Sequence, residues 1–154
     1  MKQILFLVFS GILTFEACST TQKGLKASFN QGISGFVKEI TGNQMPALTN
    51  NQNTPKALQT EVFVYELTRR SQVTGTPDTR FYTAINSKLV ASAVTDSAGS
   101  FSIPLPVGNY SVFVKLGDRF YANLFDTQNN IAPFEVAAGK ITPVQLLVNY
   151  KATY

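Results

Sequence analysis

Residues 95–114 read TDSAGSFSIPLPVGNYSVFV, and this stretch determines the fold class predicted for the chain. Apolar side chains alternate with small or polar ones in both halves, a period of two that is typical of β-strands with one buried face. Phe101 and Ile103 are expected to point inward from the first strand, and Tyr110, Val112 and Val114 from the second. Burial of each large side chain contributes about 1.5–3 kcal/mol, so the two strands are predicted to share one core.

Turn residues separate these strands from each other and from the preceding one. Asp96 and Gly99 are predicted to close a hairpin, because Asp can hydrogen bond to its own backbone and Gly accepts positive φ. Gly108 is predicted to permit the next reversal of the chain. Pro104 has no N–H for a strand ladder, so its strand is predicted to lie at a sheet edge or to end there.

The rest of the chain continues this pattern of short apolar runs separated by Gly, Pro, Asn and Thr, and no segment has the helical period. Both faces of the run at 60–68 look apolar, so the sequence leaves open which face is buried. Long loops are predicted at 42–59 and 69–80. The prediction is an all-β fold, a seven- or eight-stranded Ig-like or prealbumin-like β-sandwich. Its further strands are expected at 33–40, 60–68, 81–85, 89–95, 120–125, 134–136 and 144–150.

The motifs resemble those of a known family. Ile33-x-Gly35-x-Val37 opens the pattern, Thr95-Asp96-x-x-Gly99-x-Phe101-x-Ile103 follows, and Leu105-Pro106-x-Gly108-x-Tyr110-x-Val112-x-Val114 comes next. This arrangement resembles the carboxypeptidase regulatory-like domain, a transthyretin-like sandwich related to the B-type repeats of bacterial surface adhesins. The resemblance covers about residues 32–150. It implies a scaffold, an adhesion role or an accessory role to a partner, without peptidase activity.

The N-terminus is predicted to direct export. Lys2 precedes an apolar run of roughly a dozen residues, too short to span a bilayer as a permanent helix. The run ends at the only cysteine, Cys18, and this resembles a bacterial lipobox, which implies cleavage before Cys18 and its lipidation. Ordinary signal-peptidase cleavage and an uncleaved anchor are the alternatives. The predicted organisation is a lipoprotein signal peptide at 1–17, a flexible tether at 18–31 and the sandwich domain at 32–151. The chain is thus expected in the bacterial cell envelope, attached to a membrane through its lipid.

Composition excludes several chemistries. The 154 residues contain no His and one Cys, which excludes a His general base, a Cys/His zinc site, His-ligated haem and an intrachain disulfide. The formal net charge is +4, but the cations are scattered, so no nucleic-acid partner is predicted. No cofactor, metal or enzymatic activity is predicted. Asp118 and Asp126 flank an aromatic pair and are interpreted as solvated turn residues rather than a hydrolase pair.

Two aromatic pairs are the candidate ligand contacts, and they are Phe81, Tyr82, Phe120 and Tyr121. If the two pairs converge at one end of the sandwich, their rings can stack on sugar rings or contact an apolar partner. The alternative is that one ring of each pair belongs to the core. Asp96-Ser97-Ala98 also resembles a short bacterial O-glycosylation acceptor centred on Ser97. The predicted function is a non-catalytic structural or protein-interaction module, with another envelope protein or a surface polysaccharide as partner. The alternative is a module that binds carbohydrate or a small apolar ligand.

Overall fold

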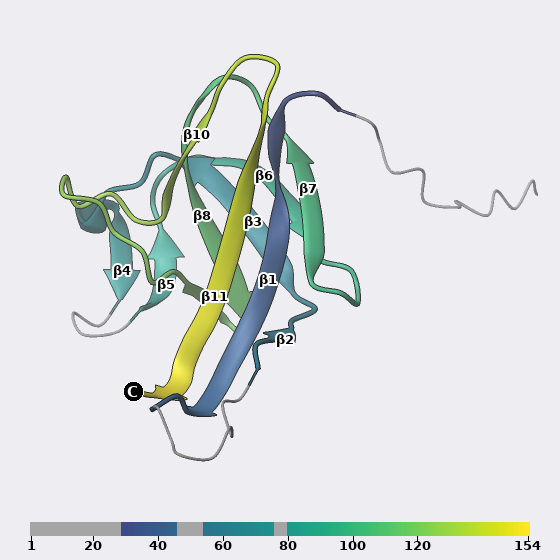
Figure 1. Ribbon diagram of the computed structural model, residues 1–154. Coiled ribbons are helices and arrows are strands. Elements are labelled where there is room, and N and C mark those ends of the chain that lie inside the picture. The colour runs from purple at the N-terminus through teal and green to yellow at the C-terminus, as the bar shows by residue number, and fades with distance from the viewer. Residues whose placement is uncertain (1–28, 46–53, 76–79) are drawn as a thin grey trace, which may run out of the picture.

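The computed structural model describes residues 29–45, 54–75 and 80–154, and two sheets packed face to face make up this part of the chain (Figure 1). The smaller, sheet A, has the order β11–β1–β2, with β7 also paired to β1. Its strands are β1 Gly32–Asn43, β2 Lys56–Ala57, β7 Ser100–Pro104 and β11 Ile141–Thr153. The all-β sandwich prediction is confirmed.

The larger sheet, sheet B, has the order β4–β5–β9–β8–β3–β6, with β10 also paired to β8. A short 3-10 turn, η1 at Arg70–Gln72, precedes β4. The strands of sheet B are β3 Glu61–Glu66, β4 Val73–Gly75, β5 Phe81–Ile85, β6 Leu89–Val94, β8 Gly108–Leu116, β9 Arg119–Tyr121 and β10 Pro133–Val136.

The first and last strands of the domain run side by side. β1 and β11 pair in parallel from Gly32↔Ile141 to Asn43↔Thr153, with a register shift between Glu39 and Thr41. Figure 1 shows these two long strands crossing the molecule together, with no other described element over their outer face. This pairing links the first and last strands of the described domain through backbone hydrogen bonds.

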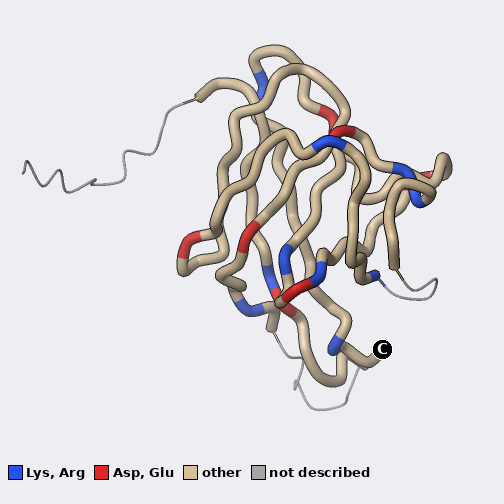
Figure 2. The backbone as a smooth tube through the Cα atoms, turned by 180° about the vertical axis from the view of Figure 1, so that it is seen from behind, with Lys and Arg blue, Asp and Glu red and all other residues tan. Residues whose placement is uncertain are grey.

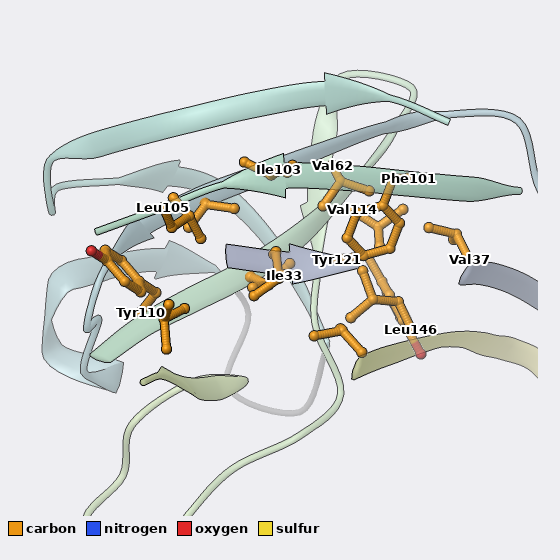
Figure 3. Close-up of a cluster of buried hydrophobic side chains, with 14 of the residues drawn as sticks. Ile33, Val37, Val62, Phe101, Ile103, Leu105, Tyr110, Val114, Tyr121 and Leu146 are labelled. Atoms are coloured by element: carbon orange, nitrogen blue, oxygen red, sulfur yellow. The ribbon is translucent and has the colours of Figure 1, made fainter. Parts of the chain in front are cut away.

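The space between the sheets holds the main core (Figure 3). As predicted, Phe101 and Ile103 lie in one buried cluster with Tyr110, Val112 and Val114. Side chains from both sheets point toward one another in this cluster. The remaining buried members include Ile33, Val37, Val62, Val64, Leu105, Tyr121, Val136, Val144, Leu146 and Val148.

A second cluster lies on the other face of sheet B and explains why several strands look apolar on both sides. Val62 and Val64 face the main core, whereas Tyr65 of the same strand belongs to the second cluster. Its buried members are Tyr65, Tyr82, Phe113, Ala122, Ile131 and Ala132. The expectation that the strand containing Tyr110, Val112 and Val114 has one buried face is therefore wrong, because residues 110–114 are buried on both faces.

The turn at Asp96–Gly99 does not close a hairpin, contrary to the prediction. β6 pairs with β3 in sheet B, whereas β7 pairs with β1 in sheet A, so this turn carries the chain from one sheet to the other. A sequence period of two is the same in both cases and does not distinguish them. Pro104 is the last residue of β7, an edge strand, as predicted.

Several predicted boundaries change. The predicted loop at 42–59 contains the end of β1 and the two-residue strand β2, and the loop at 69–80 contains η1 and β4. The strand predicted at 120–125 is only β9, because Phe125 makes an isolated bridge to Ile131. Gln31, predicted as tether, is bound to the domain, since its Nε2 donates to the Leu105 carbonyl at 2.9 Å. The short strands raise the total in the described residues to eleven.

Candidate functional site

Aromatic side chains gather where β5, β9 and β11 meet. Phe81 and Tyr121 are directly opposite each other across β5 and β9, and their ring centroids are 5.2 Å apart. The ring of Tyr150 on β11 lies 4.9 Å from Phe81 and 6.0 Å from Tyr121. Aromatic pairs attract one another at these separations. Tyr121 is buried, whereas Tyr150 is 43% exposed, so the cluster extends from the core to the surface.

Cations lie over the outer rings of this group. The guanidinium carbon of Arg119 is 4.4 Å from the ring centroid of Phe81, and the Lys151 amine is 5.1 Å from that of Tyr150. Both distances are within the roughly 6 Å at which a cation is attracted to a ring face. Lys151 also forms an ion pair with Glu39 at 3.1 Å. The surface therefore combines apolar rings with positive charge.

Asn149 connects the rings to the strands around them. Its Oδ1 accepts hydrogen bonds from Arg80 Nη1 at 2.9 Å, from the Tyr121 hydroxyl at 2.8 Å and from Asn123 Nδ2 at 3.0 Å. Its Nδ2 donates to the Tyr154 hydroxyl at 3.0 Å. These bonds fix the side chains in place. We define the aromatic cluster as Phe81, Tyr121, Tyr150, Arg80, Arg119 and Asn149.

The four predicted ligand contacts do not form one surface. Phe81 pairs with Tyr121, and Tyr82 pairs with Phe120, so the two couples lie on opposite faces of sheet B. Tyr82 and Tyr121 are buried, while Phe81 and Phe120 are half-buried. Each sequence pair thus has one ring buried and one partly exposed. This removes Tyr82 and Tyr121 from the candidate ligand contacts in the described conformation.

Sequence reasoning missed four members of this group, Arg80, Arg119, Asn149 and Tyr150. The predicted last strand ended at residue 150, and the sequence gives no sign that this end lies beside β5 and β9. A run of aromatic, amide and basic residues at 149–151 was the available signal. It becomes interpretable only once the pairing of β11 is known.

A second exposed surface is the outer face of sheet A. Phe36 on β1 is 45% exposed, and Ile141 and Leu147 on β11 are 45% and 38% exposed. Phe36 is directly opposite Gln145, one place along the same face of the strand from Leu147. A shallow depression lined by Phe36, Ile141 and Pro143 lies on this face. We define the sheet A face as Phe36, Ile141, Pro143, Gln145 and Leu147.

The residues predicted to form the first turn are structural. The Oδ1 atom of Asp96 accepts from the backbone N–H groups of Ala98 at 2.9 Å and Ser100 at 2.8 Å. Gly99 has φ of 73°, and its carbonyl accepts from the Val37 N–H at 2.8 Å, so the turn is attached to β1. Ser97 is exposed at the tip, and its glycosylation stays a prediction.

Gly108 serves a different purpose from the predicted one. The hydroxyl of Tyr110 donates to the Pro106 carbonyl at 3.0 Å, which brings the ring over Gly108. A Cβ at Gly108 would lie 3.1 Å from that hydroxyl oxygen. A tyrosine bonded to the backbone a few residues upstream is a recurring corner in β-sandwiches. Gly108 has no positive φ, and the tight approach of the Tyr110 ring favours a residue without a side chain at this position.

Acidic residues do not gather into a metal-binding group in the described part of the chain. No group of three or more His, Cys, Asp or Glu lies close enough there to hold a metal ion. Asp118 is exposed beside Gly117 in the β8–β9 turn. Asp126 accepts from the Gln128 and Asn130 N–H groups and from Asn130 Nδ2 at 2.7–2.8 Å. Figure 2 shows basic and acidic residues interspersed along the described backbone, without a stripe of one sign.

Asp126 makes the stability of the domain depend on pH. Its hydrogen bond from the Asn130 side chain holds the pKa of the Asp126 carboxyl below the ordinary value. A lowered folded-state pKa contributes stability fully above about pH 3.9 and loses it as the pH falls through the lowered value. We expect Asp126→Asn to weaken the decline in melting temperature between about pH 4 and pH 2. Thermal unfolding at a series of pH values measures this, with Asp118→Asn as the control. Equal slopes for the native chain and Asp126→Asn would contradict it.

No family model, no curated protein and no solved structure matches this chain. The resemblance to the carboxypeptidase regulatory-like domain therefore stays a prediction. Cys18, the predicted lipidation residue, lies outside the described residues. Within them, no helix is long and apolar enough to cross a membrane.

Proposed function

We propose that this protein is an exported, lipid-anchored, non-catalytic module that binds another protein of the bacterial envelope. The apolar N-terminal run that ends at Cys18 supports export and anchorage. The observation that carries the interaction role is the sheet A face. It presents Phe36, Ile141 and Leu147 to solvent on two long paired strands.

Rigidity supports a binding role for this face. β1 and β11 are joined along nearly their whole length, and their inner residues Val37, Val144 and Val148 are fully buried. Side chains on such a sheet lose little further freedom when a partner covers them, so less entropy opposes association. Exposed apolar residues grouped on one surface are a common feature of protein–protein contact sites.

Photo-crosslinking in the native cell tests the interaction. Benzoylphenylalanine replaces Phe36 or, as the matched control, Thr127, an exposed residue in the turn that follows Asp126. We expect a discrete protein adduct at position 36 that is absent at position 127. No adduct at position 36, or the same adducts at both positions, would contradict the proposed interaction.

A carbohydrate-binding module is the second candidate, and the exposure of Tyr150 within the aromatic cluster favours it. An exposed ring beside cations can stack on a sugar and bond to its hydroxyls or acidic groups. The same probe at position 150 separates the two candidates. A heterogeneous adduct that glycosidases collapse supports carbohydrate binding, whereas a protein adduct at position 36 alone supports the first candidate.

Anchorage is tested by labelling. Cells grown with an alkyne-bearing fatty acid should transfer label to the native chain and not to Cys18→Ser. Two or more acyl chains on one residue are sufficient for lasting attachment, so the native chain is expected in the membrane fraction. An unlabelled native chain in the soluble fraction would overturn the anchor and leave the crosslinking result unaffected.

A further inference from the structure

Strand β6, Leu89–Val94, forms an edge of sheet B that is regular from Ala91 to Val94 and irregular only near Val90. It pairs with β3 on one side and with no strand on the other within the described residues. Its sequence, LVASAV, contains no charge and no proline. Leu89, Val90 and Val94 are 47%, 36% and 69% exposed. Natural edge strands usually carry a charge, a proline or a cover, because their free N–H and C=O groups recruit other strands.

Three other edge strands, β7, β11 and β4, carry such protection or are short. β7 ends at Pro104. Along β11, the Leu147 carbonyl accepts from Asn123 Nδ2 at 3.0 Å, and the Thr142 hydroxyl donates to the Glu135 carbonyl next to it. β4 has only three residues. β6 is therefore the one edge among these that is both open and uncharged.

The sequence of β6 is complementary to itself. Residues 90–94 read VASAV, the same in both directions. Antiparallel pairing of two copies about Ser92 places Val90 opposite Val94 on both sides of the centre. The same register places Lys88 of each copy opposite Asp96 of the other, so opposite charges meet at both ends. Lys88 and Asp96 flank β6, and opposite charges near the two ends of a strand pair favour that register.

The direction in which the backbone N–H and C=O groups of β6 point agrees with this register. The Thr95 N–H donates to the Thr60 carbonyl at 2.8 Å, and hydrogen-bonded pairs alternate along an antiparallel ladder. The N–H and C=O groups of Val94 and Ser92 therefore point away from β3. A register shift between Val64 and Tyr65 interrupts the ladder near Val90 and marks the other end of the free edge. A groove lined by Phe29, Ala93, Val94 and Ser100 lies beside β6 in the described part of the chain.

We propose that two copies of this chain associate by antiparallel pairing of β6 about Ser92, which extends sheet B across a twofold axis. The contact is a single strand pair, so it is small and suits a reversible dimer. It is separate from the sheet A face and goes beyond the proposed function. Two tethered copies on one membrane would meet at a high effective concentration, but the pairing itself needs no anchor.

Disulfide trapping tests the register. The full-length chain carrying Cys18→Ser has no other thiol, and Ser92→Cys adds one on the proposed axis. In the proposed register Ser92 and its copy form a hydrogen-bonded pair, whose Cα atoms lie about 5.5 Å apart, within the Cα–Cα range of disulfides. Ser102→Cys, which is also exposed and lies at the centre of edge strand β7, is the matched control. Circular dichroism establishes that each variant is folded.

Under mild oxidation we expect a disulfide-linked dimer from Ser92→Cys and only background from Ser102→Cys. Adding Lys88→Glu to Ser92→Cys places like charges at both ends of the pair and should lower the dimer fraction by about two- to five-fold, as loss of exposed ion pairs does. Equal crosslinking at positions 92 and 102, none at 92, or no effect of Lys88→Glu would overturn the proposal. Because Cys18 is absent throughout, the result does not depend on anchorage.

Discussion

Phe113→Ala is expected to lower the free energy of unfolding by about 3–5 kcal/mol, the range for removing a buried Phe side chain. Phe113 is fully buried in the second cluster. Its ring lies 5.7 Å from Tyr65, 5.8 Å from Tyr82 and 6.4 Å from Phe120. These neighbours extend from different strands, so they do not move together to fill the space that the ring leaves. The remaining cavity adds its own cost to the lost transfer free energy of the side chain. A domain at the low end of ordinary stability, about 5 kcal/mol, would become marginal.

Urea denaturation followed by circular dichroism measures this change. Phe36→Ala is the matched control, because Phe36 is 45% exposed on the sheet A face, and its replacement should change stability by less than about 0.5 kcal/mol. A simple sandwich with one core and a solvated outer face on sheet B would give Phe113→Ala the same small effect. Similar losses in the free energy of unfolding for the two variants would therefore contradict the burial of Phe113 in a second cluster.

The strand pattern of β8 could be predicted from sequence, but its burial could not. Alternation at 110–114 gave the strand and the inward direction of Tyr110, Val112 and Val114. Ser111 and Phe113 occupy the alternate positions, which a half-buried strand turns to solvent. They are buried because residues of the 122–132 segment and strand β5 cover that face. Whether this face is covered depends on where distant segments fold, and the local alternation of apolar residues does not predict it.

The sheet to which each strand belongs could not be predicted from the sequence, for a related reason. The Asp96 turn has the residues of a hairpin, and its local hydrogen bonds are those of a tight turn. Whether the next strand stays in the sheet or crosses to the other is decided by its partner, here β1. The parallel pairing of β1 with β11 joins residues more than one hundred positions apart. The strands β2 and β4 have only two and three residues, so they form only where a neighbouring strand pairs with them.

The candidate site shows the same division. Sequence alone singled out Phe81 and Tyr121, which do belong to the aromatic cluster. Their sequence neighbours Tyr82 and Phe120 point to the opposite face because adjacent strand residues alternate. Tyr150 completes the cluster only through the position of β11. Local pattern therefore supplies individual side chains, and the sheet order decides which of them meet.

Gly35→Ala is expected to lower stability by at least about 3 kcal/mol, the upper part of the range for overpacking. Gly35 lies opposite Val144 in the parallel ladder of β1 and β11. A Cβ there would overlap the Val144 carbonyl oxygen and lie 2.7 Å from the carbonyl carbon. Both atoms belong to the backbone of the neighbouring strand and cannot rotate away. β1 and β11 would have to separate, and the pairing that joins the two ends of the domain would weaken.

Gly139→Ala separates this steric effect from backbone strain. Gly139 has φ of 65° and no atom within 4 Å of an added Cβ, so its replacement should cost only the roughly 1–2 kcal/mol of left-handed backbone. Gly35 has no positive φ, and conformational preference alone would make its replacement by Ala favourable in a strand interior. The two explanations thus predict opposite orders of stability for the two variants. Chemical denaturation that finds Gly35→Ala at least as stable as Gly139→Ala would contradict the close approach of β1 to β11, on which the sheet A face depends.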